Sequence, residues 1–110
     1  MKVHLIKMRT IEHYVLNNAK SRISFGNWLT VLKNADWNEP KDIIASYNTA
    51  DNLGNNTNRV VFNIAGNNYR MICKYFFGTH EVHLYVCWIG THDDYTELCR
   101  KNKQYSVNDY

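Results

Sequence analysis

The residues best suited to chemistry lie at positions 90–95, in the run GTHDDY. This run follows a long apolar stretch typical of a strand, so His92 should fall in the first turn of a helix. Histidine exchanges a proton near neutral pH and could act as an acid or a base. The helix N-terminus favours the neutral ring and Asp93 and Asp94 favour the charged one, so the charge state stays open. Tyr95 lies on the same helical face, where it could donate a hydrogen bond or stack on a base.

Two cations interrupt an otherwise apolar strand. Side chains alternate across a strand, so Arg70 and Lys74 share one face with Ile72 and lie ~13 Å apart at a rise of ~3.3 Å per residue. Residues 59–76 hold three bases and no acid. Burying an unpaired charge is costly, so this face should be open to water or to an anion such as an RNA backbone. Alternatively, Arg70 pairs with a carboxylate of a helix, or Lys74 lies at a sheet edge. A cationic face nearby favours a catalytic His92, although a lone histidine at a strand–helix junction can also be structural.

The N-terminal half should supply helices that support this surface. Apolar residues recur at helical spacing in two neighbouring segments, and Ser21 offers an N-cap for the second. Two helices joined by a few residues should pack as an antiparallel hairpin. The expected elements are a strand at 3–6, helices over 10–19 and 21–34, a turn of helix over 40–45 and a loop over 47–58.

The C-terminal half changes to the periodicity of strands. β-branched and aromatic runs predict a three-stranded meander, and the last two runs are apolar enough for central strands covered on both faces. Gly90 should end the sheet, and Thr91 should cap a final helix with Asp94 three residues on. The expected strands are 60–64, 69–77 and 82–89, followed by a helix over 91–101 and a frayed polar tail over 103–110. The predicted fold class is α+β: a small, mostly antiparallel sheet with an N-terminal helical hairpin on one face and a short C-terminal helix.

Composition bounds the class of protein. The chain has 110 residues, 45% of them hydrophobic and 21% charged, which predicts one globular domain over 1–110. No apolar run approaches the ~20 residues of a membrane span, and the N-terminus lacks a secretory signal. Three cysteines with no CxxC spacing indicate reduced thiols. We therefore expect a cytoplasmic protein.

Charge and motifs narrow the function further. Residues 1–34 carry six bases and one acid, which indicates either a surface for a polyanion or a solvated helix face. Glu81 lies between His80 and His83 along the chain, but no third metal ligand is evident. Nucleotide-binding, serine-hydrolase and zinc-protease motifs are all missing. We expect no metal or cofactor.

Two blocks of sequence resemble a known family. Residues 59–70, RVVFNIAGNNYR, and residues 86–95, VCWIGTHDDY, resemble the HigB toxins of bacterial type II toxin–antitoxin systems, within the RelE superfamily. The resemblance extends to WNEPKDI at 37–43 and covers about two thirds of the chain. It implies a RelE-like fold and an mRNA interferase that acts in the ribosomal A site without a metal. It also implies neutralisation by a HigA-type antitoxin with a helix-turn-helix domain.

The resemblance also implies roles for individual residues. Arg70 matches the family's strand arginine and would bind the scissile phosphate. His92 would act as acid or base, and Tyr95 would stack on a base or donate a proton. Lys74 is added as a catalytic candidate because it shares the face of Arg70. In this reaction a ribose 2′-hydroxyl attacks the adjacent phosphodiester. The reaction needs a base to remove the 2′ proton, a cation to stabilise the charge on the phosphorane, and an acid to protonate the departing 5′-oxygen.

RNA contacts are expected outside this centre. Arg59 opens the first motif and would hold the mRNA backbone, and Arg22 and Lys33 belong to the basic N-terminal third. Asn68 replaces a lysine common in the family, which would weaken the grip on RNA. Two other classes of function stay open: a non-catalytic relative that acts as an antitoxin corepressor or poisons gyrase, and a plain RNA-binding module.

Overall fold

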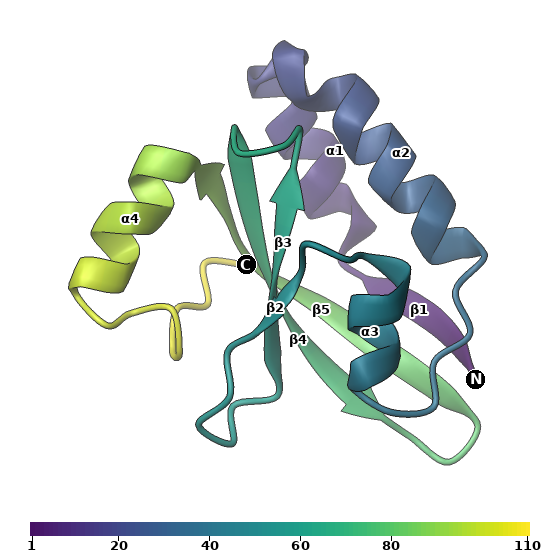
Figure 1. Ribbon diagram of the computed structural model, residues 1–110. Helices are drawn as coiled ribbons and strands as arrows, with labels where there is room; N and C mark the ends of the chain where they lie inside the picture. The colour runs from purple at the N-terminus through teal and green to yellow at the C-terminus, as the bar shows by residue number, and fades with distance from the viewer.

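A five-stranded sheet in the order β1-β5-β4-β3-β2 forms the centre of the protein (Figure 1). The computed structural model describes all of residues 1–110. β1 runs parallel to β5, and the other neighbouring strands are antiparallel. In chain order the elements are β1 (Lys2–Ile6), α1 (Met8–Asn17), a 3₁₀ turn η1 (Ala19–Ser21), α2 (Arg22–Lys33), α3 (Lys41–Ser46), β2 (Asp51–Asn52), β3 (Arg59–Ile64), β4 (Tyr69–Phe77), β5 (Glu81–Thr91) and α4 (His92–Arg100). The predicted α+β class and the mostly antiparallel sheet are confirmed.

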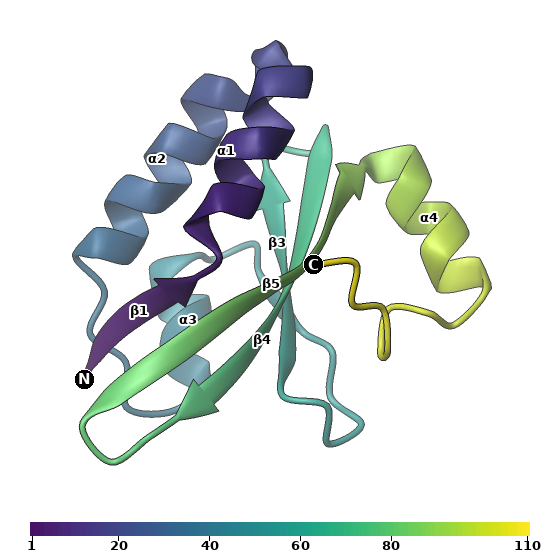
Figure 2. The same ribbon diagram turned by 180° about the vertical axis from the view of Figure 1, so that it is seen from behind.

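Helices cover the two faces of the sheet unequally. The hairpin of α1 and α2 lies with α3 on one face, and α4 lies on the other (Figure 2). We call these the hairpin face and the α4 face. A core of 17 buried residues fills the hairpin face and includes Phe25, Trp28 and Leu32 of α2. The α4 face holds a smaller cluster of Val61, Ile72, Cys87 and Trp88. Apolar burial on both faces explains why β4 and β5 lack the alternation of a half-exposed strand.

A β-bulge at Cys87 adjusts this pattern. Ile72 pairs with Trp88 and the next residue of β4 pairs with Val86, so Cys87 is the extra residue of β5. Cys87 and Trp88 consequently both face α4, whereas Val86 and Ile89 belong to the hairpin-face core. An extra residue of this kind breaks the strict alternation of a strand and increases its local twist.

The helical hairpin differs in detail from the expectation. α1 begins two residues earlier than predicted, and Ser21 does not cap α2, because its hydroxyl donates to the carbonyl of Asn18 at 2.6 Å. The turn η1 connects the two helices instead.

No helix combines the length and apolar composition that a membrane crossing would need.

The end of β5 also departs from the prediction. Gly90 does not end the sheet, because β5 continues to Thr91 and Gly90 pairs with Arg70 of β4. The predicted cap is present in full: the Thr91 hydroxyl accepts from the Asp94 amide, and the Asp94 carboxylate accepts from the Thr91 amide, both at 3.2 Å. This reciprocal cap fixes where α4 begins and therefore where His92 lies.

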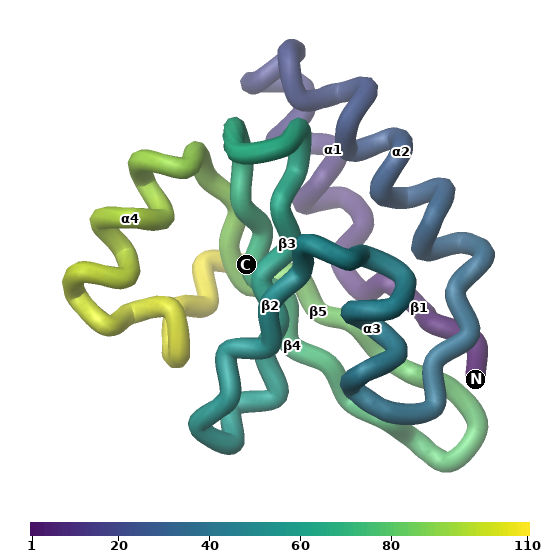
Figure 3. Tube along the Cα trace, viewed as in Figure 1, coloured from purple at the N-terminus to yellow at the C-terminus, as the bar shows by residue number.

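The tail at 103–110 is packed rather than frayed, which corrects the expectation. Figure 3 shows the chain returning from α4 to the centre of the sheet. The Nη1 atom of Arg59 donates to the carbonyl oxygens of Gln104 at 3.3 Å and Val107 at 2.6 Å. The Asp109 amide donates to the carbonyl of Cys87 at 2.9 Å. Bonds from a charged donor are stronger than neutral ones, so Arg59 holds the tail on the α4 face.

Candidate functional site

Arg70 is a nearly buried cation without an acidic partner. It lies on β4 directly opposite Gly90, on the α4 face, and only 8% of its surface is exposed. Its guanidinium donates to the carbonyl of Tyr69 at 3.2 Å and to Oδ1 of Asn67 at 3.3 Å. No carboxylate lies within ion-pair distance. A guanidinium has five donors, so an anion could still bind.

His92 lies beside Arg70 because two connections fix the start of α4. Tyr69 pairs with Thr91, and the His92 amide donates to the carbonyl of Asn68 in the β3–β4 turn at 3.0 Å. His92 comes two residues after Gly90, the partner of Arg70. Paired residues lie about 5 Å apart across the sheet, and two residues span ~6.6 Å along the strand, so these two displacements at right angles place the Cα atoms of Arg70 and His92 roughly 8 Å apart. His92 is exposed and accessible to a substrate.

Tyr95 lies one turn along α4 and is half-buried against Trp88, with ring centroids 6.1 Å apart. Burial raises the pKa of its phenol, a hydrogen bond with Cys99 adds to this, and the charge of Arg70 opposes it. The hydroxyl therefore stays protonated at neutral pH and is a donor.

Gly90 is a site residue that sequence reasoning missed. A Cβ at this position would lie 2.5 Å from ring atoms of Trp88 and 3.2 Å from Cβ of Asp94. Because Gly90 has no side chain, the Trp88 ring can lie against this residue, which pairs with Arg70 of β4. A glycine inside a strand often marks such a close approach, and this signal was available in the sequence.

Lys74 is separated from these three residues. It is exposed on β4, four residues from Arg70, and lines a different pocket of about 290 Å³. Arg59 lines this second pocket as well, with 7% of its surface exposed. The structure thus brings together Arg70, His92 and Tyr95, and it places Lys74 and Arg59 elsewhere on the same face.

Comparison of the sequence with known protein families shows the family to which the chain belongs. The family described as "HigB_toxin, RelE-like toxic component of a toxin-antitoxin system" matches residues 21–98, from the end of η1 to the last turn of α4. The chain belongs to the HigB toxin family. It is therefore the toxic component of a toxin–antitoxin system, and its partner is an antitoxin. No curated protein sequence matches the chain.

The other residues predicted to bind RNA are spread over this HigB toxin. Arg22 and Lys33 are exposed at the two ends of α2, on the hairpin face, so the sheet separates them from Arg70. Asn68 is exposed in the β3–β4 turn, where its carbonyl accepts from His92. Of these three residues, only Asn68 adjoins the site of Arg70 and His92.

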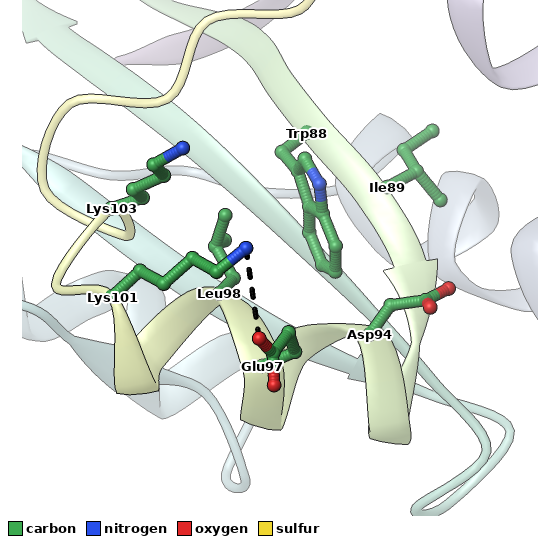
Figure 4. Close-up of a pocket in the computed structure, with 7 residues that line it drawn as sticks. All are labelled: Trp88, Ile89, Asp94, Glu97, Leu98, Lys101 and Lys103. Carbon is green, nitrogen blue, oxygen red and sulfur yellow. Dashed lines mark ion pairs between the residues drawn. The ribbon is translucent and has the colours of Figure 1, made fainter.

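A further pocket in this toxin lies between α4 and the end of β5 (Figure 4). It encloses about 310 Å³ and is lined by Trp88, Ile89, Asp94, Glu97, Leu98, Lys101 and Lys103. Lys101 pairs with Glu97 at 3.6 Å, and Figure 4 shows its ammonium group turned toward that carboxylate. Carboxylates and ammonium groups balance here, so this pocket suits an anion less well than the surroundings of Arg70.

The toxin's histidines near the β4–β5 turn form a separate group. The Glu81 carboxylate contacts His4 at 2.7 Å and His83 at 2.8 Å, and the hydrogen bond from His83 lowers the pKa of Glu81. No group of three or more His, Cys, Asp or Glu side chains is arranged to hold a metal ion. The cysteines Cys73, Cys87 and Cys99 are all free thiols.

Proposed function

We propose that this HigB toxin is a metal-independent endoribonuclease that cleaves mRNA in the A site of the small ribosomal subunit and so stops translation. One observation carries the proposal: the nearly buried guanidinium of Arg70, which has no acidic partner, lies beside the exposed His92. A phosphodiester bound to Arg70 would have its reacting oxygens within reach of the first turn of α4. A cytoplasmic location and a HigA-type helix-turn-helix antitoxin follow from the same proposal.

The reaction needs only groups of this chain and the RNA. The ribose 2′-oxygen attacks the neighbouring phosphorus, the bond from phosphorus to the 5′-oxygen breaks, and a 2′,3′-cyclic phosphate forms. One proton leaves the 2′-hydroxyl and one reaches the departing 5′-oxygen, which becomes a 5′-hydroxyl. Water can open the cyclic phosphate to a 3′-phosphate.

Each residue then has a role set by its environment. Arg70 stabilises the extra negative charge of the phosphorane, because its guanidinium is held in place by two hydrogen bonds before RNA arrives. His92 exchanges a proton with the RNA as acid or base. Tyr95 keeps its proton because burial raises its pKa, so it donates to the RNA or stacks on a base.

Substitution at the site tests the proposal. Arg70→Ala and His92→Ala should each abolish growth inhibition and the appearance of new 5′-hydroxyl mRNA ends, while the proteins still bind antitoxin and melt cooperatively. Arg70→Lys separates charge from geometry: a lysine keeps the charge but loses the planar fork, so activity should be only partly restored. Growth inhibition that survives both alanine substitutions without new RNA ends would refute the nuclease and indicate a non-catalytic toxin.

A further inference from the structure

A second concentration of positive charge lies further along the face that carries Arg70. Arg59 of β3 pairs with Lys74 of β4, Lys74 pairs with Tyr85 of β5, and Tyr85 pairs with the residue before Lys7. The side chains therefore form one row across four neighbouring segments. They border what we call the basic pocket, which encloses about 290 Å³ and is lined by Lys7, Arg59, Lys74, Tyr85, Cys87 and Asn108.

Arg59 contributes a buried charge without a counter-ion. Only 7% of its surface is exposed, and its observed partners are two carbonyl oxygens of the tail, both bonded to Nη1. No carboxylate pairs with it. Removing a charge from water costs several kcal/mol, and carbonyl oxygens compensate this only in part. The remaining donors of the guanidinium are free for an anion.

Two lysines add to this charge. Lys7 adopts the left-handed region, with φ 68° and ψ 43°, which a non-glycine residue adopts only at an energetic cost. Its side chain forms no cap for α1 and is exposed. Lys74 is likewise exposed and unpaired. No acidic residue lines the basic pocket, so the three positive charges meet unopposed.

Cys87 lines the basic pocket beside the three cations. Burial raises the pKa of its thiol, and the positive charges of Arg59, Lys74 and Lys7, with a backbone hydrogen bond at Lys74, act against that rise. The direction of these effects agrees with the three cations lining one pocket. A group carrying a negative charge there would be stabilised by the same three fields.

Aromatic rings border the basic pocket on the side away from Arg70. The ring of His83 lies 6.4 Å from that of Phe76 and 6.4 Å from that of Tyr85. Phe76 is 59% exposed and Tyr85 is 36% exposed, which is unusual for rings on central strands. In Figure 2 this part of β4 and β5 faces the viewer with no helix in front of it. Exposed rings beside cations bind single-stranded nucleic acid by stacking on its bases.

We propose that the basic pocket binds a backbone phosphate of RNA several nucleotides from the scissile bond, and that the rings of Phe76, His83 and Tyr85 stack on the adjoining bases. This inference rests on the proposed function, since it assumes that RNA is the substrate. Lys74 lies four residues from Arg70, ~13 Å along the same strand, so one RNA strand can contact both sites. Lys74 then binds RNA and does not catalyse its cleavage. The exposed rings favour RNA over an acidic peptide, which would need only the charges.

Binding of an RNA that cannot be cleaved tests this without measuring activity. The probe is a fluorescent 12-nucleotide RNA with 2′-O-methyl groups throughout, titrated by anisotropy over a series of salt concentrations. Lys7→Gly and Lys74→Gln should each make the negative slope of log K against log salt shallower by about 0.7 and weaken binding roughly fourfold at 0.15 M salt. Lys7→Gly also relieves the left-handed backbone, so its Tm should be unchanged or raised. The control, Lys41→Gln, removes a charge from α3 on the hairpin face and should leave both values unchanged.

The outcomes separate this inference from the proposed function. Slopes that become shallower in both variants and not in the control support the basic pocket. If the wild-type toxin binds and cleaves RNA but both variants keep its affinity and slope, the basic pocket is refuted and the nuclease stands. Variants that bind RNA normally but lose affinity for the antitoxin would refute RNA as the ligand in favour of an acidic protein segment. A wild-type toxin that binds no RNA would refute both proposals.

Discussion

Gly90→Ala should destabilise the toxin by a mechanism that the structure specifies. The added Cβ would lie 2.5 Å from two ring atoms of Trp88, closer than any real contact allows, and 3.2 Å from Cβ of Asp94. Trp88 is 8% exposed and packed in the cluster beneath α4, so its ring has little room to move. Overpacking of this kind costs about 1–3 kcal/mol, and 2 kcal/mol corresponds to a fall in Tm of about 8 °C for a domain of this size.

Chemical denaturation measures the effect, with Gly26→Ala as the matched control. Gly26 is inside α2 and a Cβ there meets nothing within 4 Å, so the same substitution should stabilise the protein by about 0.5–1 kcal/mol. In a Trp88→Leu background the ring is gone and Gly90→Ala should cost much less, because the two positions are coupled. If Gly90→Ala is as stable as the wild type, the close approach of Trp88 to the strand is not the reason for this glycine.

Three further predictions concern the tail, the cap of α4 and the acid stability. Arg59→Ala should release the tail and cost about 2–4 kcal/mol. Its two bonds from a charged donor are worth about 1.5–3 kcal/mol each, and removing the buried, unpaired charge offsets part of their loss. Denaturation and faster proteolysis after residue 103 would show it. Thr91→Ala removes the hydroxyl that accepts from the Asp94 amide and should cost about 1 kcal/mol of unfolding free energy, measured by denaturation, with Thr96→Ala as a control on the exposed face of α4. The pKa of Glu81 is lowered from 4.5, so its contribution to stability is present above pH 4.5 and is lost as the pH falls through the lowered pKa of the folded protein. In thermal melts, Glu81→Gln should therefore lose less Tm between neutral and acid pH than the wild type does.

Periodicity was sufficient to predict most of the fold. The meander, the helical hairpin and the cap of α4 follow from alternation, helical spacing and the Thr91–Asp94 pair, all of which depend on residues close in sequence. The parallel pairing of β1 with β5 was not predicted, because nothing local in a five-residue strand determines its neighbour. The bulge at Cys87 was missed for a similar reason: it shows only when two strands are aligned.

The site was predicted less completely than the fold. Arg70, His92 and Tyr95 were selected from the sequence, and the pairing of β4 with β5 brings them together. The hydrogen bonds by which Arg59 holds the tail could not be predicted from the sequence. Its partners are backbone carbonyls, which every residue carries, so no pattern of side chains indicates them. The tail was expected to fray because it is polar, whereas its packing depends on that distant arginine.

The bulge at Cys87 also determines where this strand can vary in length. Residues on either side of Cys87 already face the directions that a regular strand would give them if Cys87 were absent: Val86 toward the hairpin, Trp88 toward α4 and Ile89 toward the hairpin again. Deletion of this one residue would restore an uninterrupted ladder and leave His92 in place, whereas a deletion elsewhere in β5 would turn over every side chain beyond it. An alignment of homologues that differ by one residue in this strand should therefore place its gap at position 87.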